Sequence, residues 1–324
     1  MRRARSLLSK LHTRYREEVL KGMRRYYRYR GPRGRDVTTA DWDDLVIADA
    51  CRGDLLSEVR TEETVPAASG DTCRSLGATT PEFLERTFED AQLYDTVYVT
   101  ANPIYRVSEW CSADLSDTFH AIVDVWASEW DSDLGTVRPE AVTEAAYDAR
   151  DRFPQKRLLV HYVQPHYPFV GSAGNRIEHR GMQSYQKATD GETTGRWETT
   201  IWGRLKNGEV SRAAVWEAYR ENLELVLPHV AELLDTFEGR TVFTSDHGNH
   251  VGGVAFPFPI RMYGHMDGIY TSALTRVPWI VQESGTRREI VSEPPSEQST
   301  GEQPADEESA HPAAEQRLRG LGYR

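Results

Sequence analysis

Six short apolar runs, each five to seven residues long, recur along this sequence and limit its choice of fold. They lie at 45–50, 96–101, 121–126, 157–163, 241–245 and 278–282. Near-continuous apolar character over such a length is typical of strands that are buried on both faces of a sheet. Helical patterns lie between several of the runs. The alternation therefore predicts an α/β fold with a mostly parallel central sheet and helices on both faces, in which ligands gather at the carboxyl ends of the strands.

The longest helical pattern spans residues 211–237, where apolar side chains recur at a spacing of 3.6 residues. Gly239 is placed to end this helix before the next strand. Pro228 lies inside the pattern, and we expect it to kink the helix or to divide it in two.

The composition narrows the class of protein and its setting. The chain has 324 residues, of which 39% are hydrophobic, and this is enough for one large α/β domain with small appendages. The net charge is −11, and most of the positive charge comes from Arg. That balance suits a salt-adapted protein and argues against nucleic-acid binding by the main domain. The three cysteines fit neither a zinc ribbon nor a disulfide framework, and no apolar leader or membrane-spanning run is visible, so we expect a cytoplasmic protein.

The two ends of the chain differ from the middle. Residues 1–36 are dense in Arg and form a basic amphipathic segment, with apolar residues at helical spacing at Leu7, Leu8, Leu11, Tyr15, Val19, Leu20 and Met23. Two interpretations stay open: a helix that packs its apolar stripe on the domain, or an interfacial helix that holds the protein at the inner face of an anionic membrane. Residues 285–324 form an acidic tail that we expect to be disordered, with a terminal segment from Arg317 that docks again. The main domain is then 37–284.

Side chains suited to metal binding stand at the ends of the predicted strands. Asp49 closes one run, Asp246 and His247 follow another, and His166 and His265 lie beside two more. Carboxylate oxygens and imidazole nitrogens together suit a catalytic divalent ion with an open coordination position. Taken singly, Asp49, His166 and His265 have ordinary explanations as a strand terminator, a loop histidine and a surface histidine. An adjacent acid and imidazole after a buried strand need polar partners, and a metal would satisfy both.

A nucleophile is expected in the stretch SLGATTPEFLERTF at residues 75–88. Thr80 precedes Pro81, which fits a helix N-cap followed by proline at the first helical position. Capping alone is one role for Thr80. The other role is that of an alkoxide nucleophile whose pKa is lowered by a metal and by the positive end of the helix. Thr79 stays open as the alternative nucleophile.

Five stretches together resemble the alkaline phosphatase and sulfatase superfamily, most closely its archaeal sulfatase-like members. They are LVIADACRGDLL, SLGATTPEFL, HYVQPHYPFVG, TSDHGNHVG and YGHMDG followed by VPWIV, within residues 41–282. The resemblance implies a three-layer sandwich with a metal at the carboxyl edge of its sheet. The implied metal ligands are Asp49, Asp246 and His247, and the implied nucleophile is Thr80, which becomes transiently esterified. His166 would contact the ester oxygens or the leaving group, and His265 matches a histidine that completes a second metal site in two-metal relatives.

Departures from the family pattern bear on the substrate. Sulfatases proper mature a cysteine or serine of C/S-x-P-S-R into formylglycine, and this sequence lacks that motif, since Cys51 and Cys73 stand outside it. Its absence favours phosphoryl or phosphodiester chemistry over sulfate-ester hydrolysis. Val170 stands where two-zinc phosphodiesterases carry a second histidine. One divalent ion or two therefore both stay open, and Zn, Mn and Ca are all candidates.

The sequence thus predicts a metal-dependent hydrolase or transferase of phosphate or sulfate esters, acting on a small-molecule, glycan or lipid ester through a threonine. A phosphoglycerol transferase-like or mutase-like enzyme is the alternative, although residues 171–207 are short for the cap domain of a mutase. The non-enzymatic hypothesis is a catalytically degenerate scaffold of the same fold. Metal analysis of the purified protein would distinguish it from the enzyme, because a scaffold need hold no metal. Four aromatic residues either line the substrate pocket or are ordinary core or surface aromatics: Tyr167, Phe169, Trp197 and Trp202.

Overall fold

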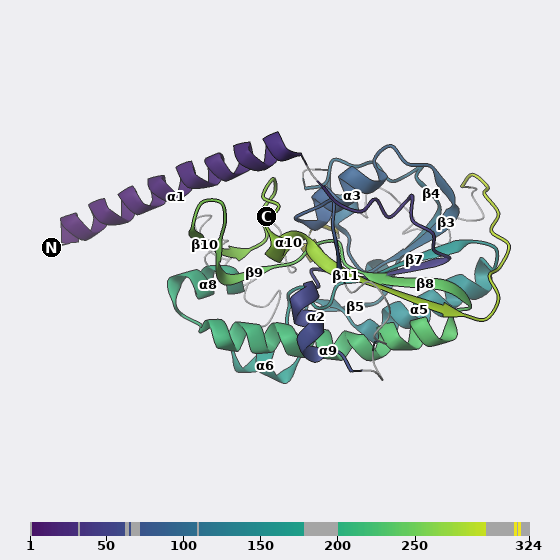
Figure 1. The fold of residues 1–324 in the computed structure, drawn as a ribbon. Helices are drawn as coiled ribbons and strands as arrows, with labels where there is room; N and C mark the ends of the chain where they lie inside the picture. The colour runs from purple at the N-terminus through teal and green to yellow at the C-terminus, as the bar shows by residue number, and fades with distance from the viewer. Residues whose placement is uncertain are drawn as a thin grey trace.

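A seven-stranded sheet forms the centre of the molecule in a computed structural model of the chain (Figure 1). The structure describes residues 2–31, 33–61, 65, 72–108, 110–177, 200–295, 314–315 and 317–318, with side chains from residue 14 on. The strands, in spatial order, are β2 (Thr72–Arg74), β11 (Arg276–Ser284), β8 (Gly239–Thr244), β1 (Asp44–Ala48), β7 (Arg157–Tyr162), β3 (Leu93–Thr100) and β4 (Phe119–Asp124). Strands β8, β1, β7, β3 and β4 are parallel, and β11 is antiparallel to both β8 and β2.

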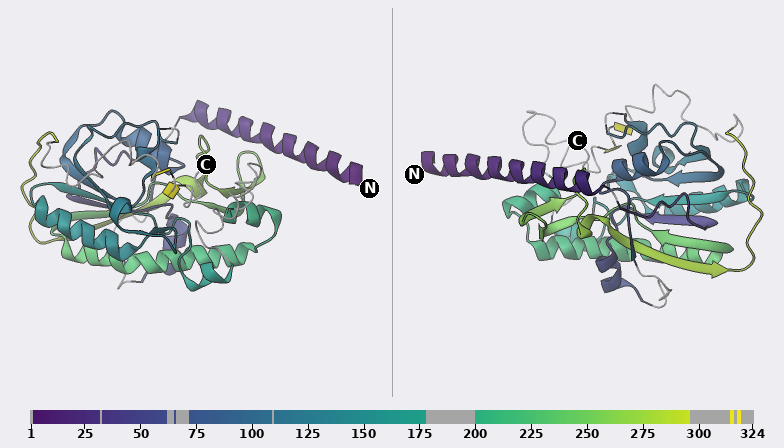
Figure 2. Two further views of the ribbon diagram at one scale, coloured as in Figure 1. Left: turned by 180° about the vertical axis from the view of Figure 1, so that it is seen from behind. Right: turned by 45° about the horizontal axis from the view of Figure 1, so that its top comes forward.

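Helices cover both faces of this sheet. The helices of the body are α2 (Gly53–Val59), α3 (Thr80–Phe88), η1 (Ile104–Arg106), α4 (Val125–Ser128), α5 (Pro139–Arg152), α6 (Ser172–Arg176), α8 (Ile201–Asn207), α9 (Arg212–Thr236) and α10 (Ser272–Thr275). Figure 1 shows α3 on one side of the sheet and α5 and α9 on the other, and the rear view in Figure 2 shows the same layers. The predicted fold class, a three-layer α/β arrangement around a mostly parallel sheet, is confirmed.

All six predicted strands are present, with shifts at their ends. The strand expected at 121–126 ends at Asp124, because the chain turns into α4 at Val125. The short strand β2 and two hairpins had no clear sequence signal: β5 (Trp130–Asp131) with β6 (Thr136–Val137), and β9 (His250–Ala255) with β10 (Ile260–Gly264). These elements are two to six residues long or contain glycine, so their hydrophobic period is weak.

Helix α9 differs in two respects from the prediction. It runs unbroken from Arg212 to Thr236 with Pro228 inside it, so the proline does not divide it. The helix ends before Phe237, and Gly239 instead opens β8 with φ of +107°. A Cβ atom at Gly239 would lie 2.4 Å from Oδ2 of Asp43, so both the backbone angle and this close approach require glycine.

The ordered domain continues beyond the predicted boundary at residue 284. The chain after β11 runs along the side of the body, where the amide of Val291 bonds to the Gln155 carbonyl and that of Glu293 to the Tyr94 carbonyl (Figure 2). Near the end of the chain, Leu318 is fully buried, and Arg317 donates to backbone carbonyls after β4. Residues 296–313, where disorder was predicted, lie outside the described residues.

The basic N-terminal segment forms helix α1 (Arg2–Arg30), which extends away from the body in Figure 1. Its second half packs on the β9–β10 hairpin, with Met23 fully buried there. Among the helices that the structure describes, none is both long enough and apolar enough to cross a membrane.

Candidate metal-binding active site

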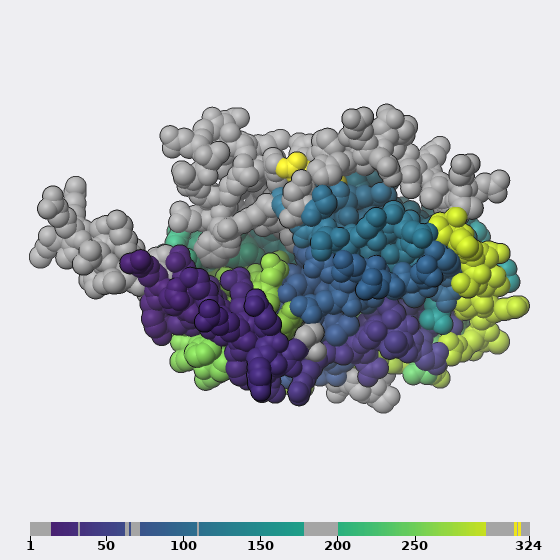
Figure 3. Space-filling model, turned by 90° about the horizontal axis from the view of Figure 1, so that it is seen from above, coloured from purple at the N-terminus to yellow at the C-terminus, as the bar shows by residue number. Residues whose placement is uncertain are grey.

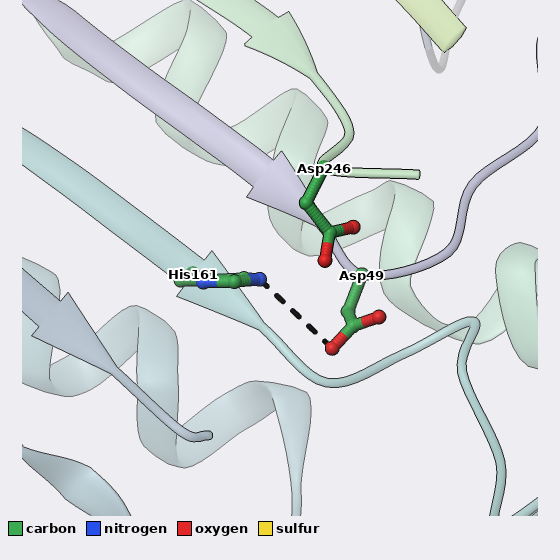
Figure 4. Close-up of side chains that lie close together, drawn as sticks. All are labelled: Asp49, His161 and Asp246. Atoms are coloured by element: carbon green, nitrogen blue, oxygen red, sulfur yellow. Dashed lines mark ion pairs between the residues drawn. The ribbon is translucent and has the colours of Figure 1, made fainter. Parts of the chain in front are cut away.

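Buried polar side chains gather at the carboxyl edge of the sheet, as the parallel strands require. Asp246 follows β8, Asp49 follows β1 and His161 lies in β7, so three adjacent strands deliver them to one place (Figure 4). All three are fully buried, and one ligand atom from each lies within 4.8 Å of the others. A cluster of two carboxylates and one imidazole is a donor set suited to a divalent cation.

His247 completes this arrangement. Its Nε2 atom lies 3.5 Å from Oδ1 of Asp49 and 3.5 Å from Oδ2 of Asp246, and its Nδ1 atom bonds to the Gly248 carbonyl at 2.9 Å. Ligands placed about 2.1 Å from a tetrahedral ion are separated by about 3.4 Å, so these spacings fit an ion held by Asp49, Asp246 and His247. Those two carboxylate oxygens are buried and have no hydrogen-bond partner within the part of the chain that the structure describes. A cation would satisfy both oxygens.

The backbone orients Asp246 for this role. The amides of Ala50 and His247 donate to its Oδ1 at 2.9 and 2.8 Å, which turns Oδ2 toward the cluster. Ala50 has φ of +60° and is the one non-glycine residue with positive φ among those described. Left-handed backbone costs an L-residue of the order of 1 kcal/mol or more and concentrates at functional sites. Here it aims an N–H group at a candidate metal ligand.

The electrostatics of the carboxylate pair also call for a positive charge. Burial raises the pKa of Asp49 well above its usual range, and the neighbouring Asp246 raises it further. Burial acts in the same direction on Asp246, but His247 and His161 outweigh it and hold its pKa below the ordinary value. Burial lowers the pKa of His161 to about 4, so this imidazole is neutral at neutral pH. Asp49 and Asp246 can therefore be ionised together in so dry a site only when a cation lies between them.

The hydroxyl of Thr80 belongs to the cluster, but Thr80 does not cap α3. Its Oγ1 lies 3.1 Å from Nε2 of His247 and 3.4 Å from Oδ2 of Asp49. The N-cap is Thr79, whose side chain accepts from the amide of Glu82, while Glu82 reaches back to the amide of Ala78. The predicted cap was therefore one residue too late. The pattern Thr-x-x-Glu at 79–82 is a capping-box signal that identifies Thr79 as the N-cap. Pro81 does not distinguish the two threonines, because proline is accepted within the first turn of a helix that starts after either one.

His166 and His265 lie beside the cluster. The ring of His265 is 4.6 Å from that of His247 and 5.3 Å from that of His166, measured between centroids. Nδ1 of His166 contacts the Tyr167 carbonyl at 2.6 Å, and Nδ1 of His265 contacts Oδ1 of Asn249 at 3.0 Å. Burial lowers the pKa of His166 to about 4 and that of His265 well below its usual value. The structure thus brings all six predicted site residues to one side of the sheet edge.

Two further residues of this site had not been predicted. His161 was read only as part of an apolar run, although a histidine inside a strand that is buried on both faces is itself a signal. Its Nδ1 bonds to the Tyr98 hydroxyl at 2.8 Å, and its Nε2 lies 4.0 Å from Oδ2 of Asp49. Asn102 follows β3 and donates to the same oxygen at 2.9 Å. Asn102 lies two residues after the end of β3, and no pattern in the surrounding sequence indicates that its side chain bonds to Asp49.

The aromatic residues considered for the substrate pocket belong to the core instead. Tyr167, Phe169 and Trp202 are 5%, 2% and 7% exposed, and their rings pack against one another. Trp197 lies outside the described residues.

Comparisons with known proteins identify structural likenesses of low sequence identity. No protein-family model matches the chain, and no curated protein matches it. The solved structures that resemble it include the integral membrane protein lipooligosaccharide phosphoethanolamine transferase A (EptA) from Neisseria meningitidis, at 16% identity and a TM-score of 0.48. That likeness covers 74% of this chain and 47% of that one, so the chain spans about half of its length. The soluble domain of the same transferase matches at 15% identity and a TM-score of 0.45, over 74% of this chain and 75% of that one. The C-terminal periplasmic domain of EcEptC from Escherichia coli, in complex with Zn, matches at 13% identity and a TM-score of 0.43. This likeness covers 78% of this chain and 76% of that one.

Proposed function

We propose that this protein is a metal-dependent phosphoryl-transfer enzyme of the alkaline phosphatase type, with Thr80 as its nucleophile. The observation that carries the proposal is the position of the Thr80 hydroxyl. It lies within hydrogen-bonding reach of His247 and Asp49, in a fully buried cluster whose carboxylate oxygens call for a cation. A hydroxyl held among metal-type ligands at the start of a helix is arranged for nucleophilic attack on an anionic ester.

The residues present fit a divalent ion, and Asp49, Asp246 and His247 would hold it. Asn102 donates to Oδ2 of Asp49 and orients its carboxylate, and Nε2 of His161 lies 4.0 Å from the same oxygen. When bound, the ion supplies positive charge that lowers the pKa of the nucleophile and offsets the two carboxylates. Zn, Mn and Ca all remain candidates for this site.

The reaction would proceed in two displacements. Oγ1 of Thr80 attacks phosphorus, and the bond to the leaving-group oxygen breaks as the new P–O bond forms. The proton of the Thr80 hydroxyl ends on the leaving-group oxygen, which departs as an alcohol. His166, beside the cluster, would contact the ester oxygens or the leaving group, and His265 would flank the same space. Water or an alcohol then takes the phosphoryl group from Thr80, which regains its proton. Water as acceptor makes the enzyme a hydrolase, and an alcohol makes it a transferase.

Thr80 has better support as the nucleophile than Thr79. The Thr79 hydroxyl accepts from the amide of Glu82 and donates to Oδ1 of Asp267 at 2.9 Å, so it is used in capping and in a loop contact. A phosphate ester is favoured over a sulfate ester because the chain lacks a formylglycine motif. Mutase-like chemistry and a catalytically degenerate scaffold remain the alternatives, and metal content together with the substrate screen separates them.

The test measures metal and turnover together. Purified protein is analysed for bound metal and assayed on an aryl phosphate, a bis-aryl phosphodiester and an aryl sulfate with several divalent ions. We expect Thr80→Ala to retain metal while its turnover falls by several orders of magnitude, because a covalent route loses its attacking atom. Thr80→Ser should keep part of the rate, and Thr79→Ala should keep most of it.

Two results would count against the proposal. Full activity in both threonine variants would remove covalent threonine catalysis. Protein that binds no divalent ion and turns over none of the three esters would favour the scaffold hypothesis.

A further inference from the structure

The surface where α1 meets the β9–β10 hairpin differs from the rest of the molecule. The apolar stripe of α1 packs on this hairpin, with Val19, Leu20 and Met23 against Ala255, Ile260 and Met262. Hydrogen bonds reinforce the contact: the Tyr27 hydroxyl donates to the Phe256 carbonyl at 2.9 Å, and Arg16 donates to the Arg261 carbonyl at 2.7 Å. The second half of α1 therefore packs its apolar stripe on the body of the protein. This agrees with the interpretation of residues 1–36 as a helix that packs on the domain.

Exposed apolar side chains nevertheless concentrate on this surface. Six large apolar or aromatic side chains stand out as exposed in the described part of the chain, and five of them belong to α1 or to the hairpin. The hairpin members are Phe256, Phe258 and Val254, which are 69%, 41% and 48% exposed, and Tyr15 and Tyr29 are the members on α1. Residues 256–259, Phe-Pro-Phe-Pro, form the turn of the hairpin. A protruding turn with two exposed phenylalanines is a feature that marks an interaction site.

A cationic cavity lies beside this turn. It is open to solvent, has a volume of about 410 Å³ and is lined in part by Arg30, Arg33 and Arg74 together with Phe256 and Pro257. Within the described residues none of the three arginines makes an ion pair, and each is exposed. Arg30 is steadied by the Tyr26 hydroxyl at 3.1 Å, and Arg74 by the Thr275 hydroxyl at 3.5 Å. Unpaired guanidinium groups around a cavity are suited to a phosphate.

The net charge of residues 1–36 is opposite in sign to that of the whole chain. Residues 1–36 contain 13 Arg and Lys and three Asp and Glu, which gives +10, whereas the whole chain carries −11. Figure 3 shows α1 in purple along one side of the molecule, next to green residues of the hairpin region. Residues 37–324 therefore carry the difference between −11 and +10, which is −21. The net positive charge lies in the segment that packs beside the exposed phenylalanines, and the acidic remainder would be repelled from an anionic surface.

We propose that the α1–hairpin surface binds the face of an anionic lipid bilayer. Phe256 and Phe258 would enter the headgroup region, and the cavity formed by Arg30, Arg33 and Arg74 would hold one lipid phosphate. Combined apolar insertion and basic charge is the pattern of proteins that lie on a membrane. A second copy that met this surface with its own α1–hairpin surface would bring the same positive charge, so a symmetric dimer through this surface is disfavoured. The inference is independent of the proposed catalytic function.

The experiment is co-sedimentation of the full chain with vesicles of two compositions. One is an equimolar mixture of phosphatidylglycerol and phosphatidylcholine, and the other is phosphatidylcholine alone. We expect the protein to bind the anionic vesicles and to bind the neutral ones little. Binding to the anionic vesicles should weaken as the salt concentration rises, because salt screens the attraction between charges. Each basic residue near such a surface changes binding by about fivefold, so the triple variant Arg30→Gln, Arg33→Gln, Arg74→Gln should bind about a hundredfold more weakly. Phe256→Ser with Phe258→Ser should lose roughly tenfold in binding and leave the salt dependence in place.

Matched controls remove charge and apolar area elsewhere. Arg138→Gln, Arg176→Gln and Arg220→Gln together remove three arginines that pair with acids away from this surface. Leu225→Ser removes an apolar side chain that is 41% exposed and lies outside this surface, the one such side chain among the residues that the structure describes. Both controls should bind anionic vesicles like the wild type or within about twofold of it, and every variant should keep the wild-type midpoint of thermal unfolding.

Three outcomes would overturn the proposal. The first is equal sedimentation with neutral and anionic vesicles, and the second is an equal loss of binding in the control triple variant. The third is absence of vesicle binding together with a wild-type dimer that becomes monomeric in the Phe256 and Phe258 variant, which would assign the surface to a second copy.

Discussion

At the scale of single residues, the candidate site depends on backbone groups that aim a few side-chain atoms. Asp246 presents Oδ2 to the cluster because two amides occupy Oδ1, and one of these amides belongs to the left-handed Ala50. Asp49 presents Oδ1 because Asn102 and Thr80 approach its other oxygen. Substitutions of these supporting residues should therefore act on the site without removing a ligand.

Ala50 offers a test of this support. Ala50→Val should lower the free energy of unfolding by about 2 kcal/mol or more. A β-branched side chain is strongly disfavoured at positive φ, and Ala50 is fully buried, so the larger side chain cannot turn toward solvent. Ala50→Gly should be tolerated, since glycine adopts this angle freely and the relief of strain offsets its entropic cost. Urea unfolding of the three proteins gives the comparison. Equal stability of Ala50→Val and wild type would show that this backbone angle has no energetic consequence.

His161 tests whether the buried cluster extends to β7. His161→Gln should weaken divalent metal affinity by about tenfold to a hundredfold, because its imidazole faces Asp49 and its other nitrogen is fixed by Tyr98. His250→Gln is the matched control: that imidazole bonds to the Thr271 hydroxyl at 2.7 Å and lies outside the candidate ligand set. Calorimetric metal titration measures both variants. Unchanged affinity in His161→Gln, or an equal loss in the control, would exclude His161 from the site.

At the scale of elements, the helices combine strong and weak local signals. The start of α3 is reinforced by a reciprocal capping box, so the short helix holds Thr80 in place beside the ligands. Helix α9 contains Pro228 and nevertheless stays continuous, because its apolar side, including Leu223, Val226 and Val230, is fully buried against the body. Tertiary packing there outweighs an unfavourable local residue.

Pro228 therefore gives a prediction for α9. Pro228 is exposed, lacks the amide that would bond to the preceding turn and crowds that turn with its ring. Pro228→Ala should raise the free energy of unfolding by about 1 to 3 kcal/mol, up to the full helix-interior penalty of proline. Urea unfolding with Leu225→Ala as a nearby exposed control would measure the gain. A loss of stability in Pro228→Ala would mean that the helix requires the geometry that proline imposes.

At the scale of the whole molecule, distant segments close the domain around the sheet. The residues after β11 return along the amino-terminal edge of the strands, where Arg288 contacts both oxygens of the buried Asp44 at 2.7 Å. Arg150 pairs with the same carboxylate. Burial raises the pKa of Asp44, and the two arginines counter that effect by pairing with it. The C-terminal segment thus takes part in the stability of the central strand.

Removing this contact should destabilise the whole domain. Arg288→Ala leaves the buried Asp44 with one guanidinium partner, Arg150, and the amide of Leu158. We expect the free energy of unfolding to fall by about 2 to 4 kcal/mol, slightly less than when a buried pair loses its only charged partner. Arg240→Gln breaks a partly exposed pair with Glu283 and should cost less than about 1 kcal/mol. Denaturant unfolding of both variants is the measurement. Similar small losses would show that Arg150 alone satisfies Asp44.

The sequence by itself determined the strands, the class of fold and most of the candidate ligands. Near-continuous apolar runs identify strands that are buried on both faces, and parallel order brings the residues after their carboxyl ends, Asp49 and Asp246, to one edge. The long helix at 211–237 was predicted to within one residue at each end, because its amphipathic period is a local property.

Only the tertiary structure decided which of these groups meet and which neighbours complete them. His161 and Asn102 join the site through the register of β7 and β3 beside β1, and register depends on pairing between residues far apart in sequence. The packing of α1 on the β9–β10 hairpin and the return of Arg288 to Asp44 likewise join segments that are more than two hundred residues apart. Periodicity records which side of an element is apolar. It does not record the partner that covers that side, because the partner is selected by the shape and charge of the assembled chain.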